Sequence, residues 1–343
     1  MNKILAGLMI GLAAYTGASA QEEILGAGAT FPYPLYSKMF GEYYKQRSVK
    51  VNYQSIGSGG GVKQIMSETV DFGATDAFID DAQLKDAKRP LIHIPMALGA
   101  VTLAYNLPGI SSIRLTPAVA ADIFLGKITN WKDPRIASLN TGVKFQDKKI
   151  VVVHRSDGSG TSSIFTDYLS KVSPEWKAKV GAGKSVNWPT GLGAKGNEGV
   201  SGLVKQMPGA LGYVELAYTR QNKMSVATIQ NKAGNWVAPE LATTSAAAVT
   251  KIPDDTRINL TDPDAKNGYP ISGFTWIVVY KDQNYANRSK AKAQEVAKLL
   301  WWMVHEGQQY SEPLDYSKLP AEALTKAEAQ LKSLTFGAEK LIP

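Results

Sequence analysis

Residues 148–172, KKIVVVHRSDGSGTSSIFTDYLSKV, place a small polar loop between an apolar stretch and a predicted helix. The apolar run within 148–155 predicts a buried strand of a parallel sheet. The loop SDGSG follows Arg155, and a helix is predicted to begin near Thr161. Small residues let backbone N–H groups converge, and a helix N-terminus adds partial positive charge. The stretch therefore predicts a corner of an α/β sheet that can hold an oxyanion.

The same arrangement occurs twice more in the chain. LGAGATFPYP (25–34) and YQSIGSGGGVKQI (53–65) each predict a strand, a turn of small residues and the start of a helix. One such turn alone is more often a cap or a linker. Three together indicate a binding site, because ligands of open α/β sheets lie at the carboxyl ends of strands. None of the three contains the Lys-Ser/Thr pair of a P-loop or a complete dinucleotide fingerprint.

The remaining pattern predicts an α/β protein of two domains or lobes. A length of 343 residues exceeds the usual size of one hydrophobic core. Strands that alternate with helical segments favour parallel sheets. Loops and surface turns are expected in the Ala-, Thr- and Asn-rich region 231–268. Further strands are predicted at 22–26, 49–55 and 91–106, and the apolar runs 209–218 and 274–280 predict buried strands of a parallel sheet, as 148–155 does.

The first 20 residues have the pattern of a secretory leader. Lys3 precedes a short apolar run, and Ala18 and Ala20 form an A-x-A cleavage site ahead of Gln21. The alternative, a retained membrane anchor, is disfavoured because the run is too short to span a bilayer comfortably. We expect a protein that is exported to the periplasm or the cell exterior without a stable membrane anchor.

Composition narrows the chemistry further. The chain has no cysteine, which excludes disulfides, thiolate metal sites, cysteine nucleophiles and a lipid anchor on cysteine. The net charge is +8, but the basic residues are scattered, so a nucleic-acid surface is not supported. The excess charge serves either solubility or an anionic ligand, and the sequence leaves both open.

Two carboxylates accompany the predicted oxyanion site. Asp157 lies two residues after Arg155 and is expected to orient or neutralise it. Asp76 ends the stretch VDFGATD (70–76), after another small-residue turn. An acid beside an anion is favourable only if the anion carries a proton to donate. Hydrogen phosphate does and sulfate does not, so Asp76 would reject sulfate by being left without a hydrogen-bond donor.

These segments, together with IFLGKITNW, NWPTGLGAKGNEGV and PGALGYVELAY, give the chain a close resemblance to the periplasmic phosphate-binding proteins of phosphate ABC importers. The resemblance runs from about residue 24 to the C-terminus. It implies a two-lobed, type II-like binding protein with mixed, mostly parallel sheets and inorganic phosphate in the cleft. It also implies which residues contact phosphate: Thr30, Phe31, Ser58, Asp76, Arg155, Asp157, Ser159, Gly160 and Thr161.

The resemblance further implies a discontinuous first lobe, 21–97 plus 273–343, and a second lobe, 98–272. The chain would cross between them near 95–101 and 270–275. Closure about these crossings would trap the ligand. The implied partner is the importer's membrane permease, which would dock transiently with a monomeric binding protein.

Two alternatives remain at this point. A secreted phosphatase would need metal ligands or an activated nucleophile, yet His93, His154 and His305 show no metal-ligand spacing. The one candidate general base beside the loop hydroxyls is Asp157, which Arg155 is expected to hold ionised and weakly basic, so we expect neither catalysis nor a cofactor. The second alternative keeps the fold and changes the oxyanion. Arsenate is protonated like phosphate and would fit the same site.

Overall fold

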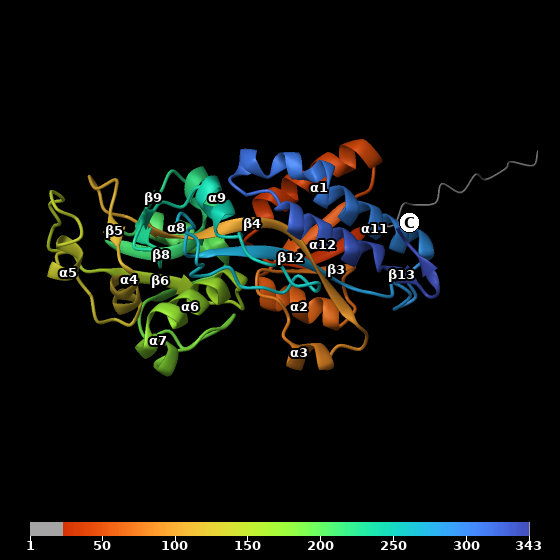
Figure 1. Ribbon diagram of the computed structural model, residues 1–343, viewed down its shortest axis with the longest axis horizontal. Coiled ribbons are helices and arrows are strands. Elements are labelled where there is room, and N and C mark those ends of the chain that lie inside the picture. The colour runs from red at the N-terminus through yellow and green to blue at the C-terminus, as the bar shows by residue number, and fades with distance from the viewer. Residues whose placement is uncertain (1–22, 343) are drawn as a thin grey trace, which may run out of the picture.

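The computed structural model describes residues 23–342, which form two α/β halves that share one sheet. Figure 1 shows the halves side by side along the long axis, with strands β4 (Leu91–Tyr105) and β12 (Ser272–Tyr280) passing between them. The strand order is β2-β1-β3-β12-β4-β8-β6-β7, so the shared strands lie at the centre. The predicted two-lobed α/β fold is confirmed. The leader predicted at 1–20 lies outside the described residues.

One half contains two of the predicted strand–turn–helix corners. Strand β1 (Ile24–Gly28) lies between β2 (Val51–Ser55) and β3 (Phe72–Thr75) and is parallel to both. Helix α1 (Tyr33–Arg47) follows β1, and helix α2 (Ser58–Met66) follows β2. The carboxyl ends of β1 and β2 therefore open at the same edge of the sheet, where both helices begin.

The other half contains the third corner. Strand β6 (Val151–Arg155) lies between β8 (Ala210–Glu215) and β7 (Leu192–Ala194) and is parallel to both, as predicted for the 148–155 stretch. Helix α6 (Gly160–Val172) begins directly after the loop, and helix α8 (Gly196–Gln206) follows β7. The N-termini of α6 and α8 thus lie together at the carboxyl end of β6.

The two central strands depart from the prediction of parallel sheets. β12 is antiparallel to both β3 and β4, so the parallel direction predicted for 274–280 is wrong. β4 pairs with β12 along Leu91–Ala100 and with antiparallel β8 along Val101–Tyr105. All residues of β4 and β12 are buried. A continuous apolar run reports burial on both faces of a sheet, but it carries no information about strand direction.

Two further predictions need correction. The strand predicted at 209–218 ends at Glu215, and helix α9 (Leu216–Gln221) begins at the next residue. Glu215 makes this switch locally, because its carboxylate accepts a hydrogen bond from the backbone N–H of Ala217 and caps the helix. The region 231–268 is mostly irregular, as predicted, but it also contains helix α10 (Leu241–Ala246).

The remaining elements cover the faces and ends of the sheet. They are α3 (Asp81–Lys85), β5 (Arg114–Leu115), α4 (Pro117–Phe124), α5 (Pro134–Ala137), α7 (Pro174–Lys179), β9 (Ser225–Val226), β10 (Thr228–Gln230), β11 (Trp236–Val237), α11 (Lys290–Val304), the 3-10 helices Glu306–Tyr310 and Glu312–Leu314, α12 (Ala321–Lys332), β13 (Thr335–Phe336) and β14 (Glu339–Lys340). One hydrophobic cluster runs through both halves and includes Leu35, Val101 and Trp176. Between residues 23 and 342, no helix is both long enough and apolar enough to cross a membrane.

Candidate functional site

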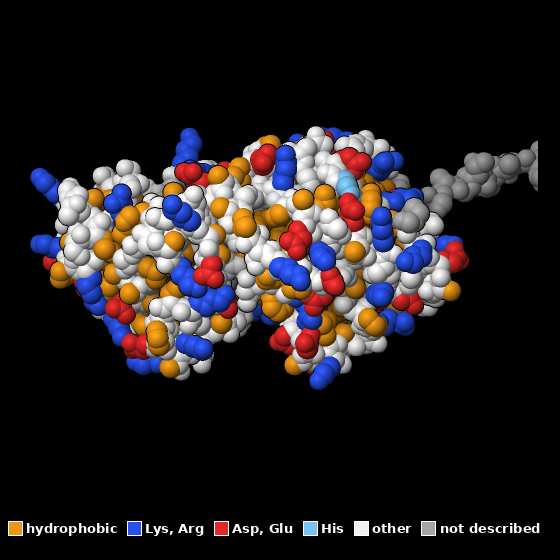
Figure 2. Space-filling view, viewed as in Figure 1, with side chains coloured by type: hydrophobic (Ala, Val, Ile, Leu, Met, Phe, Trp, Pro, Cys, Tyr) orange, Lys and Arg blue, Asp and Glu red, His pale blue; other side chains and the backbone are white. Residues whose placement is uncertain are grey.

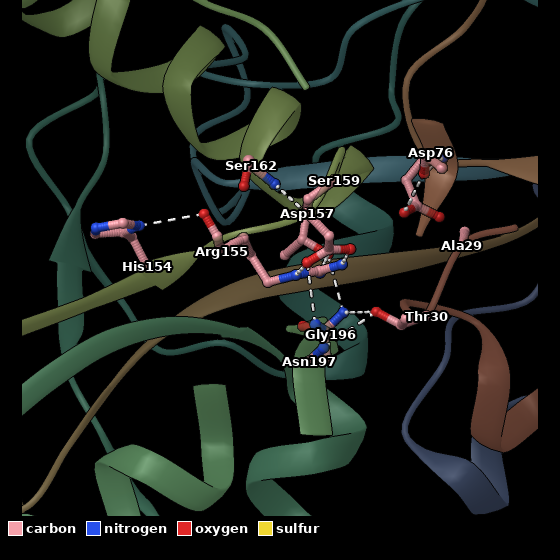
Figure 3. A network of polar contacts seen from close by, with 12 residues as sticks. Ala29, Thr30, Asp76, His154, Arg155, Asp157, Ser159, Ser162, Gly196 and Asn197 are labelled. Carbon is pink, nitrogen blue, oxygen red and sulfur yellow. Dashed lines mark hydrogen bonds and ion pairs between the residues drawn. The ribbon is translucent and has the colours of Figure 1, made fainter. Parts of the chain in front are cut away.

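The three predicted corners converge where the two halves meet. Thr30 follows β1, Ser58 opens α2, and the segment 159–161 opens α6 from the opposite half. Figure 3 shows Thr30 and Asp76 facing Arg155, Asp157 and Ser159 across this junction. Of the nine site residues predicted from the sequence, Asp157 is partly buried and the other eight are buried. The buried residues are Thr30, Phe31, Ser58, Asp76, Arg155, Ser159, Gly160 and Thr161.

The buried cation of the site is held by an acid, as predicted. Arg155 ends β6, and its Nε and Nη2 atoms donate to the two carboxylate oxygens of Asp157 at 2.7 and 2.5 Å. Burial alone would raise the pKa of Asp157, but the Arg155 guanidinium and the Gly196 N–H lower it below its ordinary value. Arg155 also donates through Nη1 to Thr161 Oγ1 at 3.3 Å. These bonds use three of its five side-chain N–H groups, and no residue between 23 and 342 accepts from the other two.

Asp76 is the carboxylate of the opposite half. It is only 3% exposed, and its oxygens accept hydrogen bonds from the hydroxyls of Ser58 at 3.2 Å and Thr275 at 2.8 Å. Burial raises the pKa of Asp76 to about 7, even though both hydroxyls and Arg155 oppose the shift. Asp76 is therefore close to the balance between ionised and neutral near neutral pH. When it is ionised both of its oxygens only accept hydrogen bonds, and when it is protonated one of them carries a donor.

The start of α6 supplies backbone donors. Ser159 caps the helix, since its Oγ accepts from the N–H of Ser162, and its own N–H donates to the Lys184 carbonyl at 2.8 Å. The first N–H groups of a helix, here those of Gly160 and Thr161, have no partner within the helix. In the turn after β1, the ring of Phe31 packs edge-on against that of Tyr316, with ring centroids 6.5 Å apart. The predicted corner thus provides N–H groups rather than side-chain charge.

The two halves touch directly around this site. The N–H of Gly59 donates to the Gly158 carbonyl of the opposite half at 2.8 Å. A Cβ atom placed on Gly160 would lie 2.5 Å from both Asp76 Oδ2 and Ser58 Oγ. Figure 2 shows the outer surface between the halves indented only at its lower edge in this view. The arrangement is therefore closed over the polar groups, and only glycine fits at position 160.

Sequence reasoning missed Asn197, which joins the two halves inside the site. This buried residue of α8 donates to Thr30 Oγ1 through its backbone N at 3.1 Å and through Nδ2 at 2.8 Å. The same Nδ2 donates to Thr161 Oγ1 at 3.0 Å. Asn197 belongs to the GNEG turn of a segment that carried the family resemblance. A glycine-flanked polar residue at a helix start was the available signal.

Sequence reasoning also missed three supporting hydroxyls. Thr275 of β12 reaches Asp76, as described above. Tyr218 of α9 donates to the Thr30 carbonyl at 2.6 Å, and Tyr316 donates to the Phe31 carbonyl at 2.7 Å. These tyrosines fix the backbone of the turn after β1 from elements more than 180 residues away in the chain. No local pattern in the sequence connects them to that turn.

The three histidines each have separate partners. His93 is buried in β4, and its Nε2 accepts the N–H of Ile79 at 3.0 Å. His154 stacks on Trp188 with ring centroids 4.9 Å apart, and His305 pairs with Glu328. Among the described residues, no group of three or more His, Cys, Asp or Glu side chains could hold a metal ion.

Fold and site together define a two-lobed binding protein whose polar site lies between the lobes. Residues 13–306 match the model of the PBP superfamily domain. The phosphate-binding protein PstS of Pasteurella multocida (strain Pm70) is 44% identical over 317 residues, which cover 91% of this chain and 90% of that protein. PstS of Methanocaldococcus jannaschii is 40% identical over 304 residues, covering 82% of this chain and 78% of that protein.

Solved structures show the same fold at low sequence identity. A periplasmic phosphate-binding protein (PfluDING), solved with bound phosphate, has a TM-score of 0.72 and 19% identity, and the match covers 92% of this chain and 96% of that one. A phosphate-binding protein from Stenotrophomonas maltophilia has a TM-score of 0.67 and 20% identity, with coverage of 90% and 93%. The chain belongs to the PstS family of phosphate-binding proteins, which are substrate-binding components of ABC transporters.

Proposed function

We propose that this protein binds hydrogen phosphate between its lobes and delivers it to the permease of a phosphate ABC importer. The observation that carries the proposal is a buried site with many hydrogen-bond donors and one carboxylate, Asp76, that is bonded to two hydroxyls but forms no ion pair with any described residue. The donors come from Arg155, from the hydroxyls of Thr30, Ser159 and Thr161 and from the start of α6. A protonated oxyanion satisfies both kinds of group at once.

Charge balance supports hydrogen bonding, rather than net charge, as the basis of selectivity. Arg155 is paired with Asp157 at 2.5 Å, so the pair contributes no net charge to the site. Phosphate and sulfate have similar shapes, and a site that relied on positive charge would take either. Asp76 distinguishes them, because sulfate has no proton to donate at neutral pH. Beside sulfate, the ionised Asp76 would keep only its bonds from Ser58 and Thr275 and would face a second anion with no proton between them.

The proposed contacts are those implied by the family resemblance, residue by residue. Thr30, Ser159 and Thr161 donate through hydroxyls, and Arg155 donates through its two remaining N–H groups. Ser58 donates through its backbone N–H, because its hydroxyl proton bonds to Asp76. Backbone N–H groups of the turn after β1 and of the start of α6 add to them. Asp76 accepts the ligand's proton. The list of proposed ligand contacts is Thr30, Phe31, Ser58, Asp76, Arg155, Asp157, Ser159, Gly160 and Thr161, with Asp157 acting through Arg155.

Lobe closure is part of the proposal. We assign 21–97 and 273–343 to the first lobe and 98–272 to the second, with the crossings near 95–101 and 270–275. The exchange of partners by β4, from β12 to β8, falls at the first crossing. The permease would recognise the closed form. The protein would act as a monomer in the periplasm, after removal of its leader, and would carry out no catalysis.

The proposal is tested by calorimetric titration of the protein from Gln21 onward, stripped of ligand by unfolding and refolding. Phosphate is expected to bind one-to-one and tightly, and sulfate to give no heat beyond dilution. Small-angle scattering on the same samples should show a smaller radius of gyration with phosphate. Absence of phosphate binding in a folded, stripped sample would overturn the proposal. Arsenate is expected to compete with phosphate, since it carries a proton at the same pH.

A further inference from the structure

Asn197 is not among the proposed ligand contacts, yet it donates hydrogen bonds to two residues that are, Thr30 and Thr161. We propose that Asn197 is a positioning residue that fixes the direction of two threonine hydroxyls, so that Thr30 and Thr161 can only donate to the ligand. This inference rests on the proposed function and deepens it. It names the residue that sets the donor character of the site, although Asn197 is not assigned a ligand contact of its own.

The orientation of the Asn197 amide is determined by the backbone. Its Oδ1 faces the N–H of Glu215 at 3.0 Å, and a backbone N–H can only donate. The atom facing Glu215 must therefore be the amide oxygen. The NH2 group then points the other way, toward the two threonines, as Figure 3 shows for Thr30. The opposite amide orientation would set two donors against each other.

Both acceptor positions of the Thr30 hydroxyl are occupied. Its Oγ1 accepts from Asn197 N at 3.1 Å and from Asn197 Nδ2 at 2.8 Å. A hydroxyl oxygen accepts two hydrogen bonds and donates one. The only hydrogen-bonding capacity that remains on the Thr30 hydroxyl is therefore its proton. No residue between 23 and 342 accepts it, so it is left for the ligand.

Thr161 is saturated in the same way by two groups that cannot accept. Its Oγ1 accepts from Asn197 Nδ2 at 3.0 Å and from Arg155 Nη1 at 3.3 Å. Neither a guanidinium nor an amide NH2 group can accept a hydrogen bond. The Thr161 hydroxyl must therefore also donate, and the described part of the protein contains no acceptor for it. One amide group thus sets two hydroxyls that come from opposite lobes.

This arrangement bears directly on selectivity. Without Asn197, each threonine hydroxyl could rotate, and either could accept the ligand's proton in place of Asp76. A site with freely rotating hydroxyls would adapt to ligands with different numbers of protons. With Asn197 present, Asp76 is the carboxylate to which the proton must go. The fixed hydroxyls also lose no rotational freedom on binding, which favours affinity.

A double-mutant cycle tests the inference. Asn197→Ala is expected to weaken phosphate binding by about 10- to 100-fold, because two donors to a charged ligand are no longer oriented. In a Thr30→Val, Thr161→Val background, the same change is expected to cost less than about 3-fold, because there is no hydroxyl left to orient. Equal losses in both backgrounds would overturn the inference, since they would show that Asn197 acts by a route other than the hydroxyls.

The matched control is Asn140→Ala. Asn140 is also a buried asparagine with its amide fully bonded, but its partners are Arg114 and Ile136, away from the site. It is expected to lower the melting temperature while leaving phosphate affinity within about 2-fold. If it weakens binding as much as Asn197→Ala does, the effect of Asn197 is a general loss of stability, and the inference is wrong.

A second measurement on the unmutated protein applies even if Asn197→Ala does not fold. In the phosphate complex, the hydroxyl protons of Thr30 and Thr161 should each show through-hydrogen-bond coupling to the ligand phosphorus by proton–phosphorus NMR. Hydroxyl protons directed at protein acceptors would overturn the inference. Calorimetry separates the two levels. If the unmutated protein does not bind phosphate, the proposed function fails. If it binds phosphate but the cycle is additive, only the role of Asn197 fails.

Discussion

Thr275 donates its hydroxyl proton to Asp76 at 2.8 Å, although the two residues lie 199 positions apart in the chain. Thr275 is on β12 and Asp76 follows β3, and these strands are antiparallel neighbours in the sheet. The bond stabilises the ionised form of a carboxylate that burial otherwise drives toward neutrality. The central strand that joins the lobes therefore also tunes the acceptor of the binding site.

Replacing the acceptor should remove the discrimination against sulfate. Asp76→Asn puts an NH2 group where the ligand's proton would go, and sulfate can accept from it. The preference for phosphate over sulfate is expected to fall by at least about 100-fold, measured by competition calorimetry. The exposed change Asp264→Asn, at a surface ion pair with Lys232, should leave the preference unchanged. Undiminished rejection of sulfate by Asp76→Asn would contradict the role given to Asp76.

The raised pKa of Asp76 predicts that the free energy of unfolding depends on pH, and that this dependence is lost in Asp76→Asn. In the closed form the pKa of Asp76 is about 7, against an ordinary value of 3.8, so between these pH values the folded state binds the proton that the unfolded state has lost. The contribution of this group to stability is then fully present below about pH 4 and is lost as pH rises through about 7.

Denaturant titrations of ligand-free wild type and Asp76→Asn, from pH 4 to 8, test whether Asp76 remains buried, with its pKa raised, when no ligand is bound. The variant should gain stability relative to the wild type as pH rises, by a total on the order of 4 kcal/mol. The comparison cancels other titrating groups that both proteins share. Parallel stability curves would show that Asp76 is solvated in the ligand-free protein and titrates as an ordinary carboxyl.

Position 160 should tolerate no side chain. A Cβ on Gly160 would meet Asp76 Oδ2 and Ser58 Oγ at 2.5 Å, so Gly160→Ala would hold the lobes apart. Phosphate affinity is expected to fall by more than about 100-fold, which corresponds to about 3 kcal/mol. Gly202→Ala in α8 is the control, because nothing lies within 4 Å of a Cβ there. It should leave binding intact and raise stability by roughly 0.5–1 kcal/mol.

Breaking the buried ion pair should affect both stability and binding. Asp157→Asn leaves the Arg155 guanidinium, with a side chain 1% exposed, beside a neutral amide. Unfolding free energy is expected to fall by about 3 kcal/mol, measured by chemical denaturation in the absence of phosphate. Added phosphate should recover part of the loss, because the ligand brings a compensating negative charge. Equal losses with and without saturating phosphate would argue against contact between Arg155 and the ligand.

Several local features were predictable because they depend on nearby residues. The strand–loop–helix corners at Thr30, Ser58 and Arg155 follow from apolar runs, small residues and caps that are contiguous in the chain. The pairing of Arg155 with Asp157 follows from a spacing of two residues. Burial of the central strands was also predictable from their apolar runs, whereas their antiparallel direction was not, since direction depends on which strands become neighbours.

The sequence by itself determined the three polar corners, the acid at position 76 and the family to which they point. Tertiary structure decided how these groups are used. Asn197 reaches Thr30 across 167 residues and Thr161 across 36, and Thr275 reaches Asp76 only because β12 passes beside β3. Hydrogen-bond direction depends on every donor and acceptor within about 3 Å. Those neighbours come from distant parts of the chain, so only the folded molecule brings them together.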